Sequence, residues 1–273
     1  MKRRAVVFIV AILAAMLLLS FTLTWISTSE ENPKLQRAAR YLELNFNSEL
    51  GLVRESPDDL DLEKHETYWL ASDNLLAWKA LELFPEHRGL AETIAQRLKK
   101  DYNIEQYDLL HDVLTGDSDL SAVDCGLKEV VLEENGYMVK IHVVDRSVKM
   151  EDACEYADRL CYKALALASN NRVEEAREVF SQALAMWDGV GLEDKAYREA
   201  GLYETYKLAL LYYTAKKLGM LDKLEFKDEL LNVIFSMQDQ ENGGFHTTYN
   251  GQMEQVGSTN SETTSLVILA LKS

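Results

Sequence analysis

A five-residue pattern, Glu-Thr-x-x-Leu, occurs three times and places a carboxylate at the start of an apolar segment. The copies begin at Glu66, Glu204 and Glu262, and each follows a turn made of Gly and an apolar residue. Carboxylates gathered at several helix ends can work as general acid and base, because neighbouring negative charges raise the pKa of one of them. We therefore expect all three glutamates at the same end of neighbouring helices, as candidate catalytic residues.

Other polar and aromatic side chains cluster near these helix starts. Asp73 follows Glu66 by seven residues, which is two helical turns along the same face, and is the fourth candidate catalytic residue. Aromatic rings beside carboxylates suit a sugar ligand, since rings pack against the apolar faces of sugars. The candidate ligand-binding residues are Tyr68, Trp69, Asn74, Tyr203, Phe245 and Tyr249.

The repeated glutamates also have a purely structural interpretation. A glutamate in the first turn of a helix complements the helix dipole and bonds free backbone amides. A metal site is a further alternative, in which His65 and His246 would join Glu66 or Glu262 in a mixed nitrogen and oxygen set. No paired histidine spacing, phosphate loop or nucleophilic serine elbow is present in the sequence. We therefore expect neither a metal nor a cofactor.

The N-terminus carries an uncharged apolar run over residues 5–26, preceded by three basic residues. The run is about 22 residues long, enough to cross the roughly 30 Å hydrocarbon layer as a helix. The basic residues favour a cytoplasmic N-terminus. We expect a membrane anchor over 1–27, a tether over 28–32 and an extracytoplasmic domain over 33–273 in a single-pass cell-membrane protein. Cleavage of the segment as a signal peptide, which would give a secreted protein, is the alternative.

Charge and cysteine content exclude some partners and frameworks. The net charge of −16 disfavours binding to nucleic acid, whose phosphates it would repel. Three cysteines are too few for a disulfide scaffold. Cys154 and Cys161 fall on one expected helix, about 10.5 Å apart along its axis, which is too far for a disulfide. Cys125 could pair with either of them in an oxidising compartment.

The remaining chain indicates paired helices. The second member of each pair is the more apolar, which indicates an inner ring of helices wrapped by an outer one. Asn135-Gly136 between two β-branched runs predicts a β-hairpin with a type I′ turn at about 127–145. We therefore expect an all-α array of about four helical hairpins with one inserted β-hairpin, preceded by the transmembrane helix. The expected helices are 33–46, 66–83, 88–102, 151–169, 172–187, 198–218, 223–237 and 261–271.

Two segments resemble parts of α/α toroid proteins. The stretch 238–245, Gln-Asp-Gln-Glu-Asn-Gly-Gly-Phe, resembles the Gln-x-x-x-Gly-Gly-Trp/Phe turn of the terpenoid cyclase and protein prenyltransferase group. The stretch 50–56, followed by 67–74, is more similar to the six-hairpin glycosidase-like superfamily, where an aromatic and acidic loop feeds a central cavity. The Asp-rich motifs of cyclases are absent, so the glycosidase-like group is the better resemblance and the cyclase-like toroid is the runner-up.

This resemblance implies a protein that binds or hydrolyses glycans in an acidic, aromatic cleft. About four hairpins are expected here, whereas closed toroids of these families usually contain six. A non-catalytic helical-repeat module that binds an unknown partner is therefore the alternative function. Convergence of Glu66, Asp73, Glu204 and Glu262 on an open cavity would favour the enzyme, and an apolar filled centre would favour the interaction module.

Overall fold

The computed structural model describes residues 32–57, 67–103 and 120–273. The chain divides into two units, residues 1–36 and residues 37–273, and helix α2 (Pro33–Leu44) begins in the first and ends in the second. The membrane helix expected over 5–26 lies outside the described residues. Among the residues that are described, no helix is long and apolar enough to cross a membrane.

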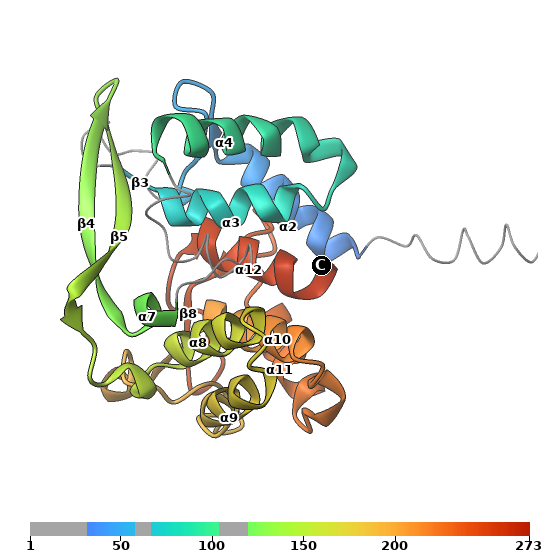
Figure 1. Ribbon diagram of the computed structural model, residues 1–273. Coiled ribbons are helices and arrows are strands. Elements are labelled where there is room, and N and C mark those ends of the chain that lie inside the picture. The colour runs from blue at the N-terminus through green and yellow to red at the C-terminus, as the bar shows by residue number, and fades with distance from the viewer. Residues whose placement is uncertain (1–31, 58–66, 104–119) are drawn as a thin grey trace, which may run out of the picture. The chain divides into compact units, whose positions relative to one another are not determined.

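Four helices of the second unit form an inner row (Figure 1). In spatial order they are α3 (Ala71–Leu81), α12 (Ser261–Lys272), α10 (Thr205–Lys217) and α8 (Ala157–Ser169). Helix α12 packs against both α3 and α10, and α10 packs in turn against α8. Most residues of these helices are buried, because their sequences are apolar on nearly every face. They belong to the four segments that the sequence marks as the more apolar members of the helix pairs.

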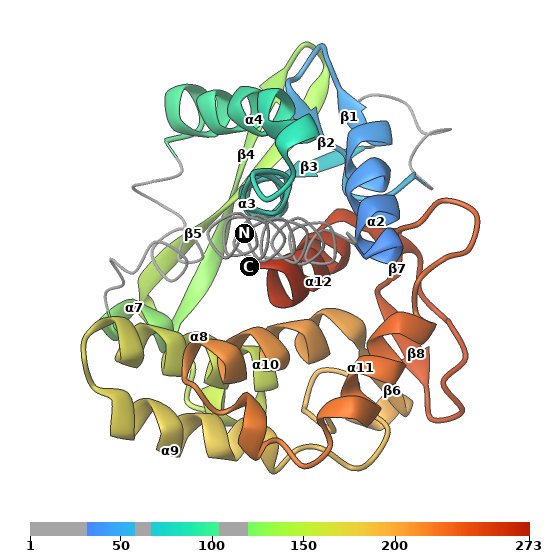
Figure 2. The ribbon, with the colours of Figure 1, turned by 90° about the vertical axis from the view of Figure 1, so that its right-hand side faces the viewer.

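Besides α2 and the short α7 (Leu120–Val123), three helices of the described residues lie outside this row. They are α4 (Arg88–Asp101), α9 (Val173–Leu184) and α11 (Lys227–Ser236). Figure 2 shows α4 above α3 and α9 beneath α8, and α11 contacts α10. Each of the three is buried on one face only. In α4 the buried residues are Ala91, Ile94, Ala95 and Leu98, at the spacing of a single helical stripe.

A long β-hairpin runs along the side of the helices. Its strands are β4 (Cys125–Glu134) and β5 (Tyr137–Lys149), paired antiparallel. Asn135 and Gly136 both have positive φ, 53° and 83°, as a type I′ turn requires. Strand β3 (Tyr68–Leu70) pairs in parallel with β5, so the sheet order is β3-β5-β4.

Three two-stranded sheets lie near the starts of the inner helices. Strand β1 (Phe46–Asn47) pairs with β2 (Leu52–Val53), β6 (Leu202–Glu204) with β8 (Thr248–Asn250), and β7 (Phe245–His246) with β9 (Thr259–Asn260). Both β6 and β9 run directly into an inner helix, which fixes the direction in which that helix starts. The short elements are α7 (Leu120–Val123), η2 (Pro85–His87), η3 (Ala153–Glu155), η4 (Arg198–Ala200) and η5 (Leu221–Lys223).

The expected fold class, an all-α array, is wrong. The described residues are mixed α/β and contain four small sheets. The largest local error concerns residues 68–70, which were expected in a helix over 66–83 but form strand β3. Tyr, Trp and Leu at these positions suit a strand, and β5 offers them an edge with unpaired backbone groups. Sequence patterns do not reveal this pairing because β5 lies about seventy residues further along the chain.

The structure also corrects the expected arrangement of the cysteines. Helix α8 begins at Ala157 rather than at residue 151, so Cys154 lies in η3 and does not share a helix with Cys161. Cys125, Cys154 and Cys161 are all unpaired, and only Cys154 is exposed.

Candidate functional site

The four inner helices start at the same end, so their first turns lie next to one another. Asn74 of α3 bonds to the backbone of Val53, and the backbone N–H of Ser261 at the start of α12 donates to Glu55 O at 2.8 Å. The same short segment thus holds the starts of α3 and α12. Asp194 links the starts of α8 and α10 in a similar way. The sequence therefore brings polar first turns together although the helix bodies are apolar.

A buried lysine forms the centre of the cluster. Lys207, in the first turn of α10, has a side chain only 3 % exposed. Its Nζ donates to Asp194 Oδ2 at 2.6 Å and also pairs with Glu204, the residue that precedes the helix. Burial by itself would lower the pKa of Lys207, but Asp158, Glu204 and Asp194 outweigh it and raise that pKa. The lysine is therefore charged and neutralises part of the acidic cluster.

Asp194 links two helix starts, that of α8 directly and that of α10 through this lysine. Its carboxylate is also buried and accepts hydrogen bonds from the backbone N–H groups of Ala157, at 3.1 Å, and Ala196, at 3.0 Å. Ala157 is the first residue of α8, whose free N–H groups favour a negative charge. One carboxylate thus anchors α8 to the first turn of α10.

Glu262 is the carboxyl group with the most perturbed environment. It is the second residue of α12 and is partly exposed as a residue, yet its carboxyl group faces other acids. Burial first, and then the negative charges of Asp158 and Glu204, raise the pKa of Glu262 to about 8, while Lys207 acts in the opposite direction. At neutral pH this group is mainly a protonated acid.

Asp158 provides a second carboxyl group with different surroundings. It lies in the first turn of α8 and accepts a hydrogen bond from Tyr206 Oη at 3.2 Å and one from the backbone N–H of Arg159 at 2.9 Å. Burial, followed by the charges of nearby acids, raises the pKa of Tyr206 and of Tyr162 well above 10, so both hydroxyls stay protonated. The cluster thus combines a protonated acid, a hydrogen-bonded carboxylate and two phenols.

The structure brings together two of the four candidate catalytic residues, Glu204 and Glu262. Glu66 lies outside the described residues. Asp73 is buried in the first turn of α3, where Ser72 Oγ lies 3.4 Å from its Oδ1. Glu204 immediately precedes α10 and Glu262 is the second residue of α12, so these two glutamates lie at the starts of adjacent inner helices, as expected. Their offsets from the helix start differ by two residues, and the expected position of Glu66 stays a prediction.

Two of the expected ligand-binding residues on and beside β3 have structural partners. Trp69 is fully buried, with its ring edge against Tyr137 at a centroid separation of 5.7 Å. Asn74 is also fully buried and bonds to the backbone of Val53 in both directions. Tyr68 is exposed, and the ammonium of Lys140 lies 3.8 Å from its ring centre. Of these three, only Tyr68 presents its ring at the surface.

The other three expected ligand-binding residues are also held by the protein. Tyr203 donates to Asp188 and stacks on Tyr249 at a centroid separation of 5.4 Å. Tyr249 is buried and donates to Val190 O at 3.0 Å. Phe245 is a fully buried core residue. These rings contribute to the loops that support the helix starts, and their expected role in ligand binding stays a prediction.

Five residues of the cluster were not predicted from the sequence, namely Asp158, Tyr162, Asp194, Tyr206 and Lys207. Four of them lie in the first two turns of α8 or α10, where a polar residue interrupts an otherwise apolar segment. That interruption is the signal that could have identified them. Nothing in the sequence near Asp194 indicates its role. Among the described residues, no group of three His, Cys, Asp or Glu side chains is arranged to hold a metal ion.

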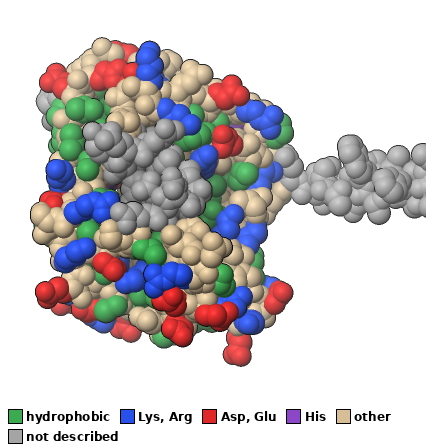
Figure 3. Space-filling model, viewed as in Figure 1, with side chains coloured by type: hydrophobic (Ala, Val, Ile, Leu, Met, Phe, Trp, Pro, Cys, Tyr) green, Lys and Arg blue, Asp and Glu red, His purple; other side chains and the backbone are tan. Residues whose placement is uncertain are grey.

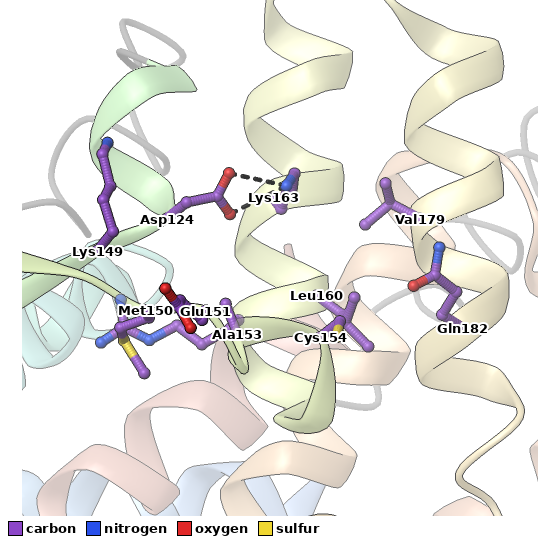
Figure 4. Close-up of a pocket in the computed structure, with 11 residues that line it drawn as sticks. Asp124, Lys149, Met150, Glu151, Ala153, Cys154, Leu160, Lys163, Val179 and Gln182 are labelled. Carbon is purple, nitrogen blue, oxygen red and sulfur yellow. Dashed lines mark hydrogen bonds and ion pairs between the residues drawn. The ribbon is translucent and has the colours of Figure 1, made fainter.

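Two pockets lie near Cys154. The first, of about 290 Å³, lies between α8 and α9, and Figure 4 shows the ion pair between Asp124 and Lys163 on one side of it and Cys154 with Gln182 on the other. The second, of about 390 Å³, is lined by Cys154 and residues of the loop after α9. Neither of these two is lined by Glu204 or Glu262. Their mixed charges do not define a ligand class.

Comparisons with protein-family models, with curated proteins and with solved structures each gave no match. The chemistry of the cluster therefore has to be inferred from its own geometry and charge.

Proposed function

We propose that the carboxylate cluster at the starts of α8, α10 and α12 binds and hydrolyses glycans by general acid–base catalysis. The observation that carries the proposal is the raised pKa of Glu262, about 8, to which burial and then the charge of Asp158 contribute, while Asp158 itself accepts a hydrogen bond from Tyr206. Two carboxyl groups held in unlike environments at one site are the usual basis for dividing acid and base roles.

Glycoside hydrolysis uses such a pair directly. One carboxylic acid protonates the oxygen of the leaving sugar, and a second carboxylate activates water or attacks the sugar itself. Glu262 would be the acid, and Asp158 the carboxylate. Glu204 would help to keep Glu262 protonated, and Lys207 would hold Glu204 in place. The choice of glycans as substrates rests on the resemblance of residues 50–56, followed by 67–74, to the six-hairpin glycosidase-like superfamily.

The proposal is tested by screening the full-length protein, in a non-ionic detergent, against a panel of oligosaccharides at several pH values. Glu262→Gln and Asp158→Asn should each lower the rate of hydrolysis about 100-fold or more, as loss of a general acid or base does. Glu241→Gln is the matched control, because Glu241 is exposed and lies outside the cluster. The rate of the unmodified protein should fall as pH rises past about 8, where Glu262 loses its proton.

Two results would contradict the proposal. One is the absence of binding or cleavage for every glycan in the panel. The other is cleavage that survives both substitutions at the rate of the Glu241→Gln control, which would locate the chemistry elsewhere.

A non-catalytic interaction module is the second candidate function. A different observation favours it, namely the exposed apolar edge strand β4 at the side of the molecule. The two candidates are separable, because β4 contributes no residue to the carboxylate cluster.

A further inference from the structure

Strand β4 is a long sheet edge with exposed apolar side chains. It is the outer strand in the order β3-β5-β4, and no strand in the described part of the chain pairs with its outer side. Figure 3 shows hydrophobic side chains among charged ones along this side of the molecule. The exposed apolar residues of β4 are Leu127, Val130, Val131 and Leu132, between 37 % and 42 % exposed. Proteins usually shorten, charge or cover such an edge, because its free backbone groups can pair with another strand.

The hairpin turn determines which backbone groups of β4 are free. Glu134 and Tyr137 flank the two-residue turn, so they form a hydrogen-bonded pair, and such pairs recur at every second residue of an antiparallel ladder. Even-numbered residues of β4 therefore bond to β5. The N–H and C=O groups of the odd-numbered residues, Leu127, Glu129, Val131 and Glu133, point away from the sheet.

We propose that this edge pairs antiparallel with β4 of a second copy of the chain, with Val131 opposite Val131 of that copy. A two-fold axis perpendicular to the sheet places equal residues symmetrically about its centre and keeps matching faces together. Centring it on Val131 uses the outward backbone groups identified above. It also sets Val130 opposite Leu132 of the second copy, so exposed apolar side chains are covered on both faces.

The charges along β4 favour this register. Lys128 comes to lie opposite Glu134 of the second copy, and the symmetry produces this opposite-charge pair twice. Glu134 is already held by Tyr102, which donates to it at 2.6 Å, and by an ion pair with Arg97, so its position is fixed before pairing and Lys128 adds a second cation to it. Glu129 meets Glu133 of the second copy, but Lys140 lies 3.0 Å from Glu129 and balances its charge.

The neighbouring register, centred on Val130, gives less favourable side-chain pairs. Pairing centred on Val130 would also use the outward groups, but it sets Lys128 opposite Leu132 and Glu129 opposite Val131. Charged residues would then face apolar ones throughout, and no opposite-charge pair would form. The side-chain sequence therefore selects the register centred on Val131.

The oligomeric state tests this inference. The full-length protein in non-ionic detergent should have the protein mass of a dimer at tens of micromolar, measured by light scattering coupled to size exclusion. Val131→Lys should raise the dissociation constant at least tenfold, because it places two ammonium groups at the symmetry axis. Val148→Lys is the matched control, since Val148 is an equally apolar, exposed residue on β5, and it should leave the dimer intact.

Cross-linking provides a second measurement in case Val131→Lys disturbs folding. In a Cys154→Ser background, Val131→Cys should form a disulfide-linked dimer on mild oxidation, because opposed residues in this register have Cα atoms about 5.5 Å apart. Val148→Cys in the same background should not. A monomer at about 100 µM would overturn the proposal, and so would a dimer that Val131→Lys leaves unchanged and Val131→Cys does not cross-link.

Discussion

The starts of α3 and α10 both bury polar groups, but α3 does so with a neutral amide and α10 with a charged lysine. Both begin an inner helix and must bury polar groups. At α3 a neutral amide, Asn74, satisfies the backbone of Val53 with hydrogen bonds of 2.6 and 3.0 Å. At α10 a charged group, Lys207, lies between Asp194 and Glu204. Hydrogen bonds from a neutral amide hold the backbone in place and do nothing else. Buried charges also change the pKa values of the ionisable groups around them. The α10 side is therefore the one suited to chemistry.

The largest expected effect in this comparison comes from Lys207→Met. The substitution keeps much of the side-chain volume but leaves Asp194 and Glu204 buried without their cation. Removing one partner of a buried pair costs about 3–5 kcal/mol of stability, because the remaining charge is uncompensated. The measurement is the free energy of unfolding from urea titration at pH 7.

Lys195→Met is the matched control for that experiment. Lys195 also contacts two acids, Asp152 and Glu155, at 2.6 and 3.2 Å, but at the surface, where its side chain is 39 % exposed. Exposed ion pairs contribute about 0–1 kcal/mol. If both substitutions cost the same, the distinction between a buried charged centre and ordinary surface pairs would fail.

The α3 side of the comparison is tested by Asn74→Ala. The change leaves the buried N–H and C=O of Val53 without their partner and removes a third bond, to Leu70 O at 2.9 Å. The expected loss is about 2–3 kcal/mol, because unsatisfied buried groups keep their full desolvation penalty. Thermal and urea unfolding measure it, and the loss should not vary between pH 5 and pH 8.

Asn170→Ala provides the control, since the Asn170 side chain bonds to Ala166 O at the exposed end of α8. It should cost less than about 1 kcal/mol. A pH-dependent effect at Asn74 would show that the buried Asp73 beside it couples to this amide, and would contradict a purely neutral role for Asn74.

Local sequence signals were sufficient for some elements. Asn135-Gly136 predicted the hairpin turn because both residues tolerate the positive φ that a type I′ turn needs. The start and end of α12 were predicted within one residue, since Asn260 caps its first turn and accepts from the Thr263 N–H. In contrast, strand β3 forms by pairing with β5, about seventy residues further along the chain. Local sequence signals do not report such a pairing, and this is one reason why the predicted all-α fold class was wrong.

The same division applies to the candidate site. The positions of Glu204 and Glu262 at helix starts were predicted because a local repeat marks those starts. Asp158, Asp194 and Lys207 were missed because their contacts join segments that are distant in the sequence, as when Asp194 accepts from Ala157, 37 residues earlier. The role of the expected aromatic residues stays open for a related reason. Their types suit both sugar binding and core packing, and only the folded chain decides between the two.

The smallest expected effect concerns Glu262 and distinguishes the two sides by pH. Its pKa of about 8 in the folded protein exceeds the ordinary value of 4.5, mainly because of burial and then the charge of Asp158. A raised folded pKa means that the native state binds the proton more tightly, so the contribution of Glu262 to stability is present below about pH 4.5 and is lost as pH rises towards 8. Each unit of pKa corresponds to about 1.4 kcal/mol, and partial solvent exposure reduces the total, so a loss of about 1–2 kcal/mol is expected.

The Glu262→Gln variant tests this because glutamine cannot titrate. Its free energy of unfolding in urea should exceed that of the unmodified protein by an amount that grows between pH 5 and pH 8. Glu241→Gln, an exposed control, should follow the unmodified protein throughout. If instead Glu262→Gln shifts stability by a constant amount at every pH, its carboxyl group ionises normally, and the start of α12 is as neutral a structural element as the start of α3.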